Sequence, residues 1–230
     1  MERYLGLLVF VCAFGVYLHT LTPSVGLHDS GELITVAYTL GIAHPPGYPL
    51  YTLLGKLWTT IIPIGSIAFR MNMQSALFAS LAVMMTYFIT LKVSGRAEER
   101  KNGRIISSVV ASLILAFSPT FWEQAVIAEK YTLNAFFFSL LVFVLLKWQD
   151  SRLQTPDSRL LYLFSFILGL SFTHHFQTIY LVPASLFFIL AVPLFQRGVC
   201  GADGVFLSKF HLPRQASPEV PSRKGNKLKT

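Results

Sequence analysis

Charged residues are scarce in this sequence. They make up 13% of the 230 residues, whereas an ordinary soluble domain carries roughly 25%. Hydrophobic residues make up 53%, and they occur in runs longer than a soluble core requires. The composition therefore excludes an ordinary soluble domain and predicts an all-α integral membrane protein.

Cysteine is also scarce. The chain contains only Cys12, within an apolar run, and Cys200, in a polar segment near the C-terminus. Two cysteines in such different surroundings are not expected to meet, so neither a disulfide framework nor thiol chemistry is expected.

Six apolar segments are candidates for helices that cross a bilayer, which takes about 20 residues. They are residues 4–21, 71–91, 105–122, 131–146, 160–175 and 176–195. The first could be a signal peptide, but no small-x-small cleavage site follows it, which favours a retained span. The last two could instead form one re-entrant hairpin. Residues 50–62, which contain Lys56 and Trp58, are typical of a helix lying in the membrane interface.

Basic residues lie mainly on one side of these spans. If the N-terminus is cytoplasmic, all of the 19 Lys and Arg residues except Lys56, Arg70 and Lys130 fall on the cytoplasmic side. The positive-inside rule therefore predicts this orientation, in a bacterial inner membrane or an endoplasmic reticulum membrane. The basic residues flank spans and form no patch interleaved with aromatic residues, so we expect membrane lipids and no nucleic acid as partners.

The polar residues suited to chemistry gather in loops on the opposite, non-cytoplasmic side. The candidates there are Asp29, Glu32, His44, Tyr48, Glu129, Lys130, His174 and His175. No Asp, Glu, Lys or Arg needs to lie at the middle of a span, which argues against a transport path through the bilayer. The pattern predicts a site at the outer membrane surface, within or near a long first loop at residues 22–70.

Asp29 and Glu32 stand three positions apart before an apolar stretch, which allows two interpretations. They could form a capping box at the start of a helix. Alternatively, the fixed carboxylate of Asp29 could accept a proton from a hydroxyl nucleophile, with Glu32 next in line for this role. Capping does not exclude chemistry, because a carboxylate at a helix start also has a fixed direction.

The segment from His44 to Pro49 cannot be regular helix, because its three prolines fix their own φ and restrict the residues before them. It could be only a rigid turn that returns the chain to the membrane, or its rigidity could aim His44 and Tyr48 at a ligand. His174 and His175 could bind a ligand or be merely hydrogen-bonded. Glu123 and Glu129 are expected to be solvated.

Four of the outer residues raise the question of a zinc site. They are His28, Asp29, His44 and His174. Their spacing matches no metal signature, so no metal site is predicted.

Two stretches in the first outer loop resemble the signature of the transmembrane O-mannosyltransferase family. They are residues 29–34 (DSGELI) and 41–50 (GIAHPPGYPL). A second match comprises Trp122, residues 127–129 and residues 133–134, and a weaker third lies near His175. The resemblance covers about residues 1–195. It implies a GT-C glycosyltransferase fold, which has many spanning helices and an active site on the non-cytoplasmic face. With the apolar segments above, the expected fold is an all-α, GT-C-like membrane region of about six spans with a long first non-cytoplasmic loop.

The resemblance also implies a reaction. A sugar, expected to be mannose, would pass from a polyprenyl-phosphate donor to a hydroxyl of a protein or glycan, without a cofactor. The family's acidic residue falls on Asp29, with Glu32 as the second catalytic candidate. The substrate-binding candidates are His44, Tyr48, Glu129, His174 and His175, and donors to the phosphate are available from His44, His174, His175, Lys130 and Arg70.

The chain departs from the family pattern near Gln196. Residues 196–230 are basic and rich in Pro, Ser, Gly and Lys, so we expect a disordered cytoplasmic tail. Residues 1–195 then correspond to the N-terminal part of a longer enzyme, which leaves the activity of this chain alone open. The alternative is a non-catalytic multi-span protein or a transporter subunit.

Overall fold

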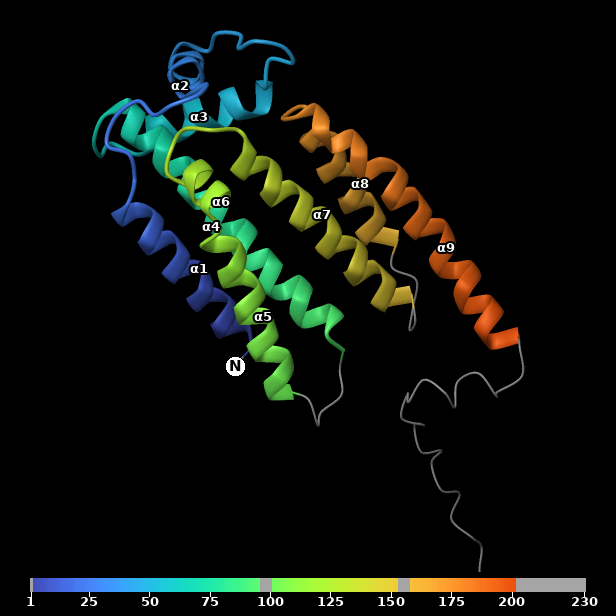
Figure 1. Cartoon of the computed structure of the whole chain (residues 1–230). Helices are drawn as coiled ribbons and strands as arrows, with labels where there is room; N and C mark the ends of the chain where they lie inside the picture. Colours follow the sequence, from blue (N-terminus) through green and yellow to red (C-terminus); the bar gives the residue numbers. More distant parts are fainter. Residues whose placement is uncertain (1, 96–100, 153–157, 202–230) are drawn as a thin grey trace, which may run out of the picture. The chain divides into compact units, whose positions relative to one another are not determined.

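The computed structural model describes residues 2–95, 101–152 and 158–201 (Figure 1). This part of the chain contains helices and no strand, so the predicted all-α fold is confirmed. The helices are α1 (Glu2–His19), α2 (Ser30–Thr39), α3 (Pro49–Ile61), α4 (Ile67–Val93), α5 (Lys101–Ala116), α6 (Pro119–Ala125), α7 (Tyr131–Arg152), α8 (Ser158–Phe172), the short 3₁₀ helix η2 (Phe176–Tyr180) and α9 (Leu181–Gly201).

The chain divides into two compact units. The first comprises Met1–Leu186, and the second begins at Phe187. In the second unit the described residues are the remainder of α9, which continues past the predicted boundary at Gln196. Residues 202–230 lie outside the described part, so the disordered tail stays a prediction.

Three helices are long and apolar enough to cross a membrane, namely α1, α4 and α7. The pair α5 and α6 makes a fourth candidate if counted as one span, and it bends by 67° at the break before Pro119. The expected break in the third apolar segment is thus confirmed, and the chain is an all-α membrane protein.

The six predicted spans are not all present as single long helices. Helix α8 has only 15 residues, which corresponds to roughly 22 Å at 1.5 Å per residue and is short of the roughly 30 Å hydrocarbon core. It ends at Phe172. The residues that follow leave the helix, and His174 and His175 are buried, with the His174 ring hydrogen-bonded to the Lys130 carbonyl. Residues 176–191 also form a shorter apolar stretch than a full span needs.

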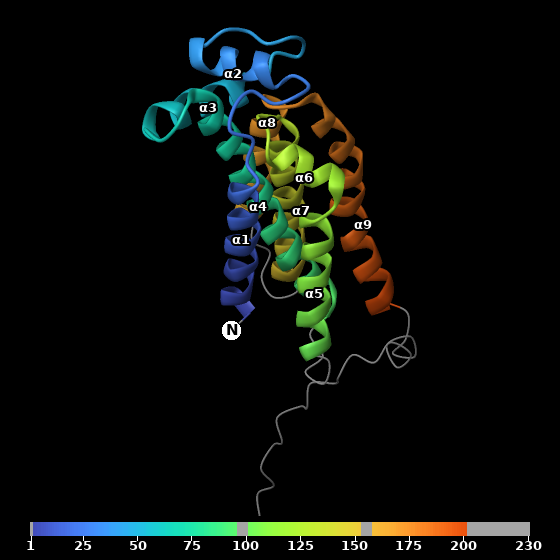
Figure 2. The same cartoon turned by 60° about the vertical axis from the view of Figure 1, so that its left-hand side comes forward.

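Helix α4 lies at the centre of the first unit, with α1, α5 and α7 packed against it (Figures 1 and 2). Small buried side chains on α4, such as Ala76 and Ala79, allow the neighbouring helices to approach closely. The Tyr17 hydroxyl donates a hydrogen bond to the Ala116 carbonyl at 2.8 Å, which ties α1 to α5. These contacts pack α1, α5 and α7 against α4. The loops that carry the candidate residues begin or end at these helices.

Helices α2 and α3 lie across one end of the bundle (Figures 1 and 2). Gly55 permits close packing there, because a Cβ at this position would lie 2.8 Å from both the Ala37 Cβ and the Met71 Cε. Along α3, Leu53 and Leu57 remain exposed. The expected helix at residues 50–62 is therefore present as Pro49–Ile61, and its place in the membrane interface stays a prediction.

Helix α4 also anchors the loop before α2 and the loop before α7. The Asn72 side chain donates to the carbonyls of Thr22 and Ser24 at 2.7 and 2.9 Å. One turn further along, the Ser75 hydroxyl accepts from the Glu129 main-chain N–H at 3.2 Å and lies 3.3 Å from the Glu129 carbonyl. The loop before α2 and the loop before α7 are thus fixed to the same helix.

Candidate active site

The proline-rich turn holds His44 in place with help from Glu32. The Glu32 carboxylate accepts a 2.6 Å hydrogen bond from the His44 main-chain N–H and lies 2.9 Å from the ring Nδ1. The Tyr48 hydroxyl lies 3.2 Å from the other ring nitrogen, Nε2. Gly47 adopts a φ of 94°, in the left-handed region that glycine tolerates best. The His44 ring is therefore held from both sides, by Glu32 and by Tyr48, and its role toward a ligand stays a prediction.

Asp29 occupies the N-cap position of α2 without capping it. Its side chain makes no hydrogen bond to the helix start, so the capping-box interpretation is wrong for this carboxylate. Instead Asp29 forms an ion pair with the Lys130 ammonium, and its Oδ2 lies 3.8 Å from the His44 Nε2. The Asp29 main-chain N–H donates to the Glu129 Oε1 at 3.0 Å. The loop before α2 and the loop before α7 thus meet at Asp29.

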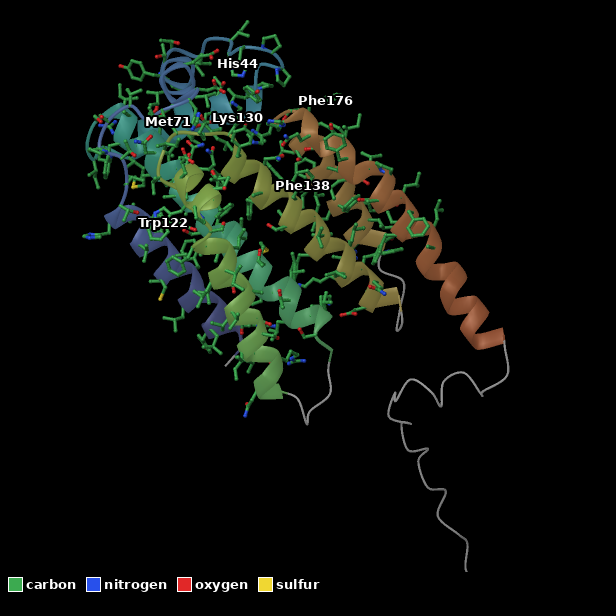
Figure 3. The ribbon with its side chains drawn as sticks, in the orientation of Figure 1. His44, Met71, Trp122, Lys130, Phe138 and Phe176 are labelled. Atoms are coloured by element: carbon green, nitrogen blue, oxygen red, sulfur yellow. The ribbon has the colours of Figure 1, made fainter. Side chains whose placement is uncertain are left out.

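Lys130 and Glu129 are buried beneath this meeting point. The Lys130 side chain is 3% exposed and the Glu129 side chain 1%, and the ammonium lies 3.6 Å from the Glu129 Oε2. The expectation that Glu129 is solvated is wrong, because Ser75 holds its main chain against α4. The rings of Tyr48 and Tyr131 face the Lys130 ammonium at 5.2 and 5.1 Å, an arrangement that favours a cation. Figure 3 shows Lys130 and His44 at the same end of the bundle.

The two adjacent histidines complete the wall of the site. The His174 Nε2 donates to the Lys130 carbonyl at 2.9 Å, which leaves Nδ1 as the ring acceptor. The His175 Nδ1 accepts from the Gln177 main-chain N–H at 3.1 Å. The His175 ring centroid lies 5.5 Å from that of Tyr48 and 6.0 Å from that of Tyr131. Both histidines therefore have structural partners and also border the buried ammonium.

The pKa values follow from these contacts. The hydrogen bond from Lys130 lowers the pKa of Asp29, and the hydrogen bond from His44 lowers that of Glu32. Burial raises the pKa of Glu129. Burial alone would lower the pKa of Lys130, but the bond to Asp29 and the charge of Glu129 outweigh it, so this pKa is raised. The site thus keeps a fixed ammonium beside an ionised, 43% exposed Asp29 carboxylate.

The possible metal ligands differ from those weighed from the sequence. Among the described residues, Asp29, Glu32 and His44 form a group whose ligand atoms lie within 4.8 Å of one another. His28 instead pairs with Glu123 at 3.2 Å, and the His174 ring bonds to a carbonyl, so the set of His28, Asp29, His44 and His174 does not converge. The Lys130 ammonium beside Asp29 would repel a metal cation at the converging group.

Comparison with known proteins bears on the identity of this site. Residues 29–196 match the family described as the Protein O-mannosyl-transferase TMEM260 N-terminal domain. The chain belongs to this family. It is 33% identical over 186 residues to the protein O-mannosyl-transferase TMEM260 of Mus musculus, an alignment that covers 79% of this chain and 25% of the mouse protein.

A second relative lies at a greater evolutionary distance. The Dictyostelium discoideum protein O-mannosyl-transferase tmem260 is 29% identical over 196 residues, covering 80% of this chain and 23% of that protein. The chain therefore spans about a quarter of the length of these curated relatives. No solved structure matches the chain. Membership in the O-mannosyl-transferase family confirms the resemblance seen in the first outer loop.

The structure brings the catalytic and substrate-binding candidates predicted from the sequence into one cluster. They are Asp29, Glu32, His44, Tyr48, Glu129, His174 and His175. Arg70 does not join them, because its guanidinium donates to the carbonyl of Thr59 in α3 and to those of Ile64 and Gly65 in the turn before α4. Sequence reasoning missed Tyr131 and Ser75. The sequence gives no indication that either belongs to the site. Tyr131 is typical of an interfacial aromatic residue, and Ser75 is a polar residue within a predicted span.

Proposed function

We propose that this chain is the N-terminal part of a membrane mannosyltransferase. In this proposal, mannose passes from a polyprenyl-phosphate donor to a hydroxyl of a protein acceptor. Family membership supports the sugar and the acceptor class. The distribution of basic residues supports a cytoplasmic N-terminus and a site on the non-cytoplasmic face of an endoplasmic reticulum or bacterial inner membrane.

The proposal includes the spans that the structure leaves short. Helix α8 and the η2–α9 segment would complete a six-span, GT-C-like region together with α1, α4, α7 and the bent α5–α6 pair. Their flanking polar residues, His174 and His175, belong to the candidate site. A GT-C-like arrangement would place the polyprenyl tail among the spans and the sugar phosphate beside the outer loops.

The observation that carries the proposal is the placement of the Asp29 carboxylate. It is partly exposed, fixed by Lys130 and close to the His44 ring. Since its pKa is lowered, it is ionised at neutral pH and can accept a hydrogen bond, and then the proton, from an incoming hydroxyl. Positioned general bases of this kind contribute roughly 10² to 10⁴ to a rate.

Lys130 supplies the opposite charge that the leaving phosphate needs. Its ammonium is shielded from water by the Tyr48 and Tyr131 rings and by burial. A charge in such surroundings acts more strongly on a developing anion than a solvated one does. His44 and Tyr48, which share the exposed side of the cluster, would contact the sugar or the acceptor.

The test needs a protein that completes the catalytic machinery. Mannose transfer is measured with membranes that contain the mouse relative in which the matching region is replaced by residues 29–196 of this chain. Asp29→Asn should lower transfer by about 10² to 10⁴ while membrane insertion is unchanged. Glu123→Gln, which removes an outer carboxylate paired only with exposed His28 among the described residues, is the matched control.

Two outcomes would contradict the assignment. Near-normal transfer by Asp29→Asn together with loss in Glu32→Gln would exchange the roles of the two carboxylates. Normal transfer by both variants would place the base outside this cluster and return the chain to the class of non-catalytic membrane subunits.

A further inference from the structure

A cavity of about 670 Å³ lies at the end of the first unit opposite the candidate active site. Its lining residues come from the start of α1, the second halves of α4 and α7 and the start of α5. Four basic residues from these four helices line it: Arg3, Lys92, Arg104 and Lys147. Its volume falls in the range of small-molecule sites, roughly 300 to 1,000 Å³.

The rest of the lining is mostly apolar. Met85, Phe88 and Leu91 contribute from α4, and Phe143 contributes from α7. The Phe88 and Phe143 rings contact each other with centroids 6.2 Å apart. The cavity therefore presents an aromatic and aliphatic wall together with cationic side chains, which matches a molecule with an apolar body and an anionic head.

Only part of this positive charge is neutralised within the described residues. Lys92 pairs with Asp150, and Arg104 pairs with Glu2. Arg3 forms no ion pair with a carboxylate of the described residues, and the Lys147 ammonium lies over the Phe143 ring at 5.2 Å. The Arg104 Nε is buried without a hydrogen-bond partner in the same part of the chain. Spare donors and spare charge thus remain at the cavity.

Membrane topology explains why basic residues occur at this end of the helices but not why they converge. The positive-inside rule is satisfied by Lys and Arg anywhere in the short connections. Here side chains from four helices line a single cavity beside aromatic rings. Basic pockets between spanning helices on the cytoplasmic side suit anionic lipid headgroups.

We propose that this cavity binds one anionic phospholipid of the cytoplasmic leaflet, with its phosphate between Lys147, Arg3 and Arg104 and its acyl chains along the Phe88 and Phe143 wall. The orientation follows from the basic connections, and the proposal does not depend on the chemistry at Asp29. The bound lipid would link α1, α4, α5 and α7 at the end remote from the active site.

The proposal is tested with the purified full chain in detergent. The midpoint of thermal unfolding is followed during titration with dioctanoyl phosphatidylserine, and dioctanoyl phosphatidylcholine, inorganic phosphate and glycerophosphoserine are titrated in parallel. Phosphatidylserine alone should raise the midpoint in a saturable way, because ligand that binds only the folded state stabilises it. The double variant Arg3→Gln/Lys147→Gln, which leaves both ion pairs intact, should weaken binding roughly 25-fold, at about fivefold per basic residue.

Arg159→Gln is the matched control, because it removes one exposed charge at the start of α8, outside the cavity lining. It should leave the affinity unchanged. Equal stabilisation by phosphatidylcholine, or by inorganic phosphate or glycerophosphoserine, would overturn the proposal in favour of a general lipid effect or a free-anion site. Unchanged affinity in the double variant, or equal weakening by Arg159→Gln, would also overturn it.

Discussion

Lys130 and Asp29 form an ion pair although 101 positions separate them in the chain. The two partners differ in exposure, since the Lys130 side chain is 3% exposed and the Asp29 side chain 43%. A buried ammonium is unfavourable unless it is paired. Asp29 therefore completes the surroundings of Lys130, and Lys130 fixes the charge and direction of Asp29.

Removing this ammonium should change how the activity depends on pH. In Lys130→Met the pKa of Asp29 loses the interaction that lowers it, so the acid limb of the transfer rate should move to higher pH. Transfer at neutral pH should also fall by on the order of 10², because the leaving phosphate loses its charge partner. The pH profile of the chimeric enzyme measures both effects.

Lys56→Met is the control for that variant. Lys56 is a basic residue of α3, and its ammonium donates to the Tyr38 carbonyl, away from the cluster. Its replacement should leave the acid limb in place. An acid limb that stays unchanged in Lys130→Met would show that Asp29 is not the group that titrates.

Glu32 is expected to act through His44. Glu32→Gln removes the charged acceptor of two His44 bonds, so the ring should lose its fixed orientation and transfer should fall roughly tenfold, the effect of about 1.4 kcal/mol. In a His44→Ala background the same change should have little further effect, because residues in one network are not additive. The four rates form a double-mutant cycle, and additive losses would separate the two residues.

The first outer loop was the part most accessible to sequence reasoning. Asp29, Glu32, His44 and Tyr48 lie within twenty positions, and the prolines between them restrict the backbone, so a local cluster follows from the chain itself. The burial of Glu129 could not be predicted in this way. It depends on a hydrogen bond from its main-chain N–H to the Ser75 hydroxyl, 54 positions earlier. The hydropathy of a short loop does not predict a contact with a residue so distant in sequence.

Some of the helices could also be predicted from the sequence, and others only in part. The long apolar runs of α1, α4 and α7 predicted spans, and the proline at 119 predicted the bend before α6. The segment at residues 160–175 forms a shorter helix than predicted, because α8 ends at Phe172 and Thr173, His174 and His175 lie beyond it. Their hydrogen bonds to Leu170, Lys130 and Gln177 end the helix early.

The stability of the protein should depend on pH through His174. Burial lowers the pKa of His174 from 6.5 to about 3, so between these values the unfolded chain binds a proton that the folded protein does not. The free energy of unfolding should therefore fall as the pH drops below about 6.5, by roughly 1.4 kcal/mol per pH unit from this residue.

Unfolding in detergent at pH 7.5, 6.0 and 5.0 tests this effect. His174→Gln can still donate to the Lys130 carbonyl but does not titrate, so its loss of stability on acidification should be smaller by this amount. Above pH 7 the two proteins should differ by a constant free energy. Parallel curves down to pH 5 would show that His174 is protonated in the folded state.

The orientation can be tested independently of activity. With Cys12 and Cys200 replaced by serine, a cysteine at exposed Ser24 should react with an impermeant thiol reagent from the non-cytoplasmic side. A cysteine at exposed Ser94, after the end of α4, should react only once the membrane is opened. Reversed labelling would invert the membrane orientation and remove the basis for an outer-face active site.

The anchoring of both outer loops on α4 has a consequence for the order in which the protein is made. In the proposed orientation, Asp29 reaches the non-cytoplasmic side of the membrane before Lys130 has been synthesised, so its carboxylate is at first solvated and unpaired. Asn72 can secure the loop before Asp29 as soon as α4 has inserted, but Ser75 must wait for the loop that carries Glu129. A substitution that removes the Ser75 contact would therefore be a defect of assembly. Every helix could still insert, but the Asp29 carboxylate would stay solvated and would not pair with Lys130.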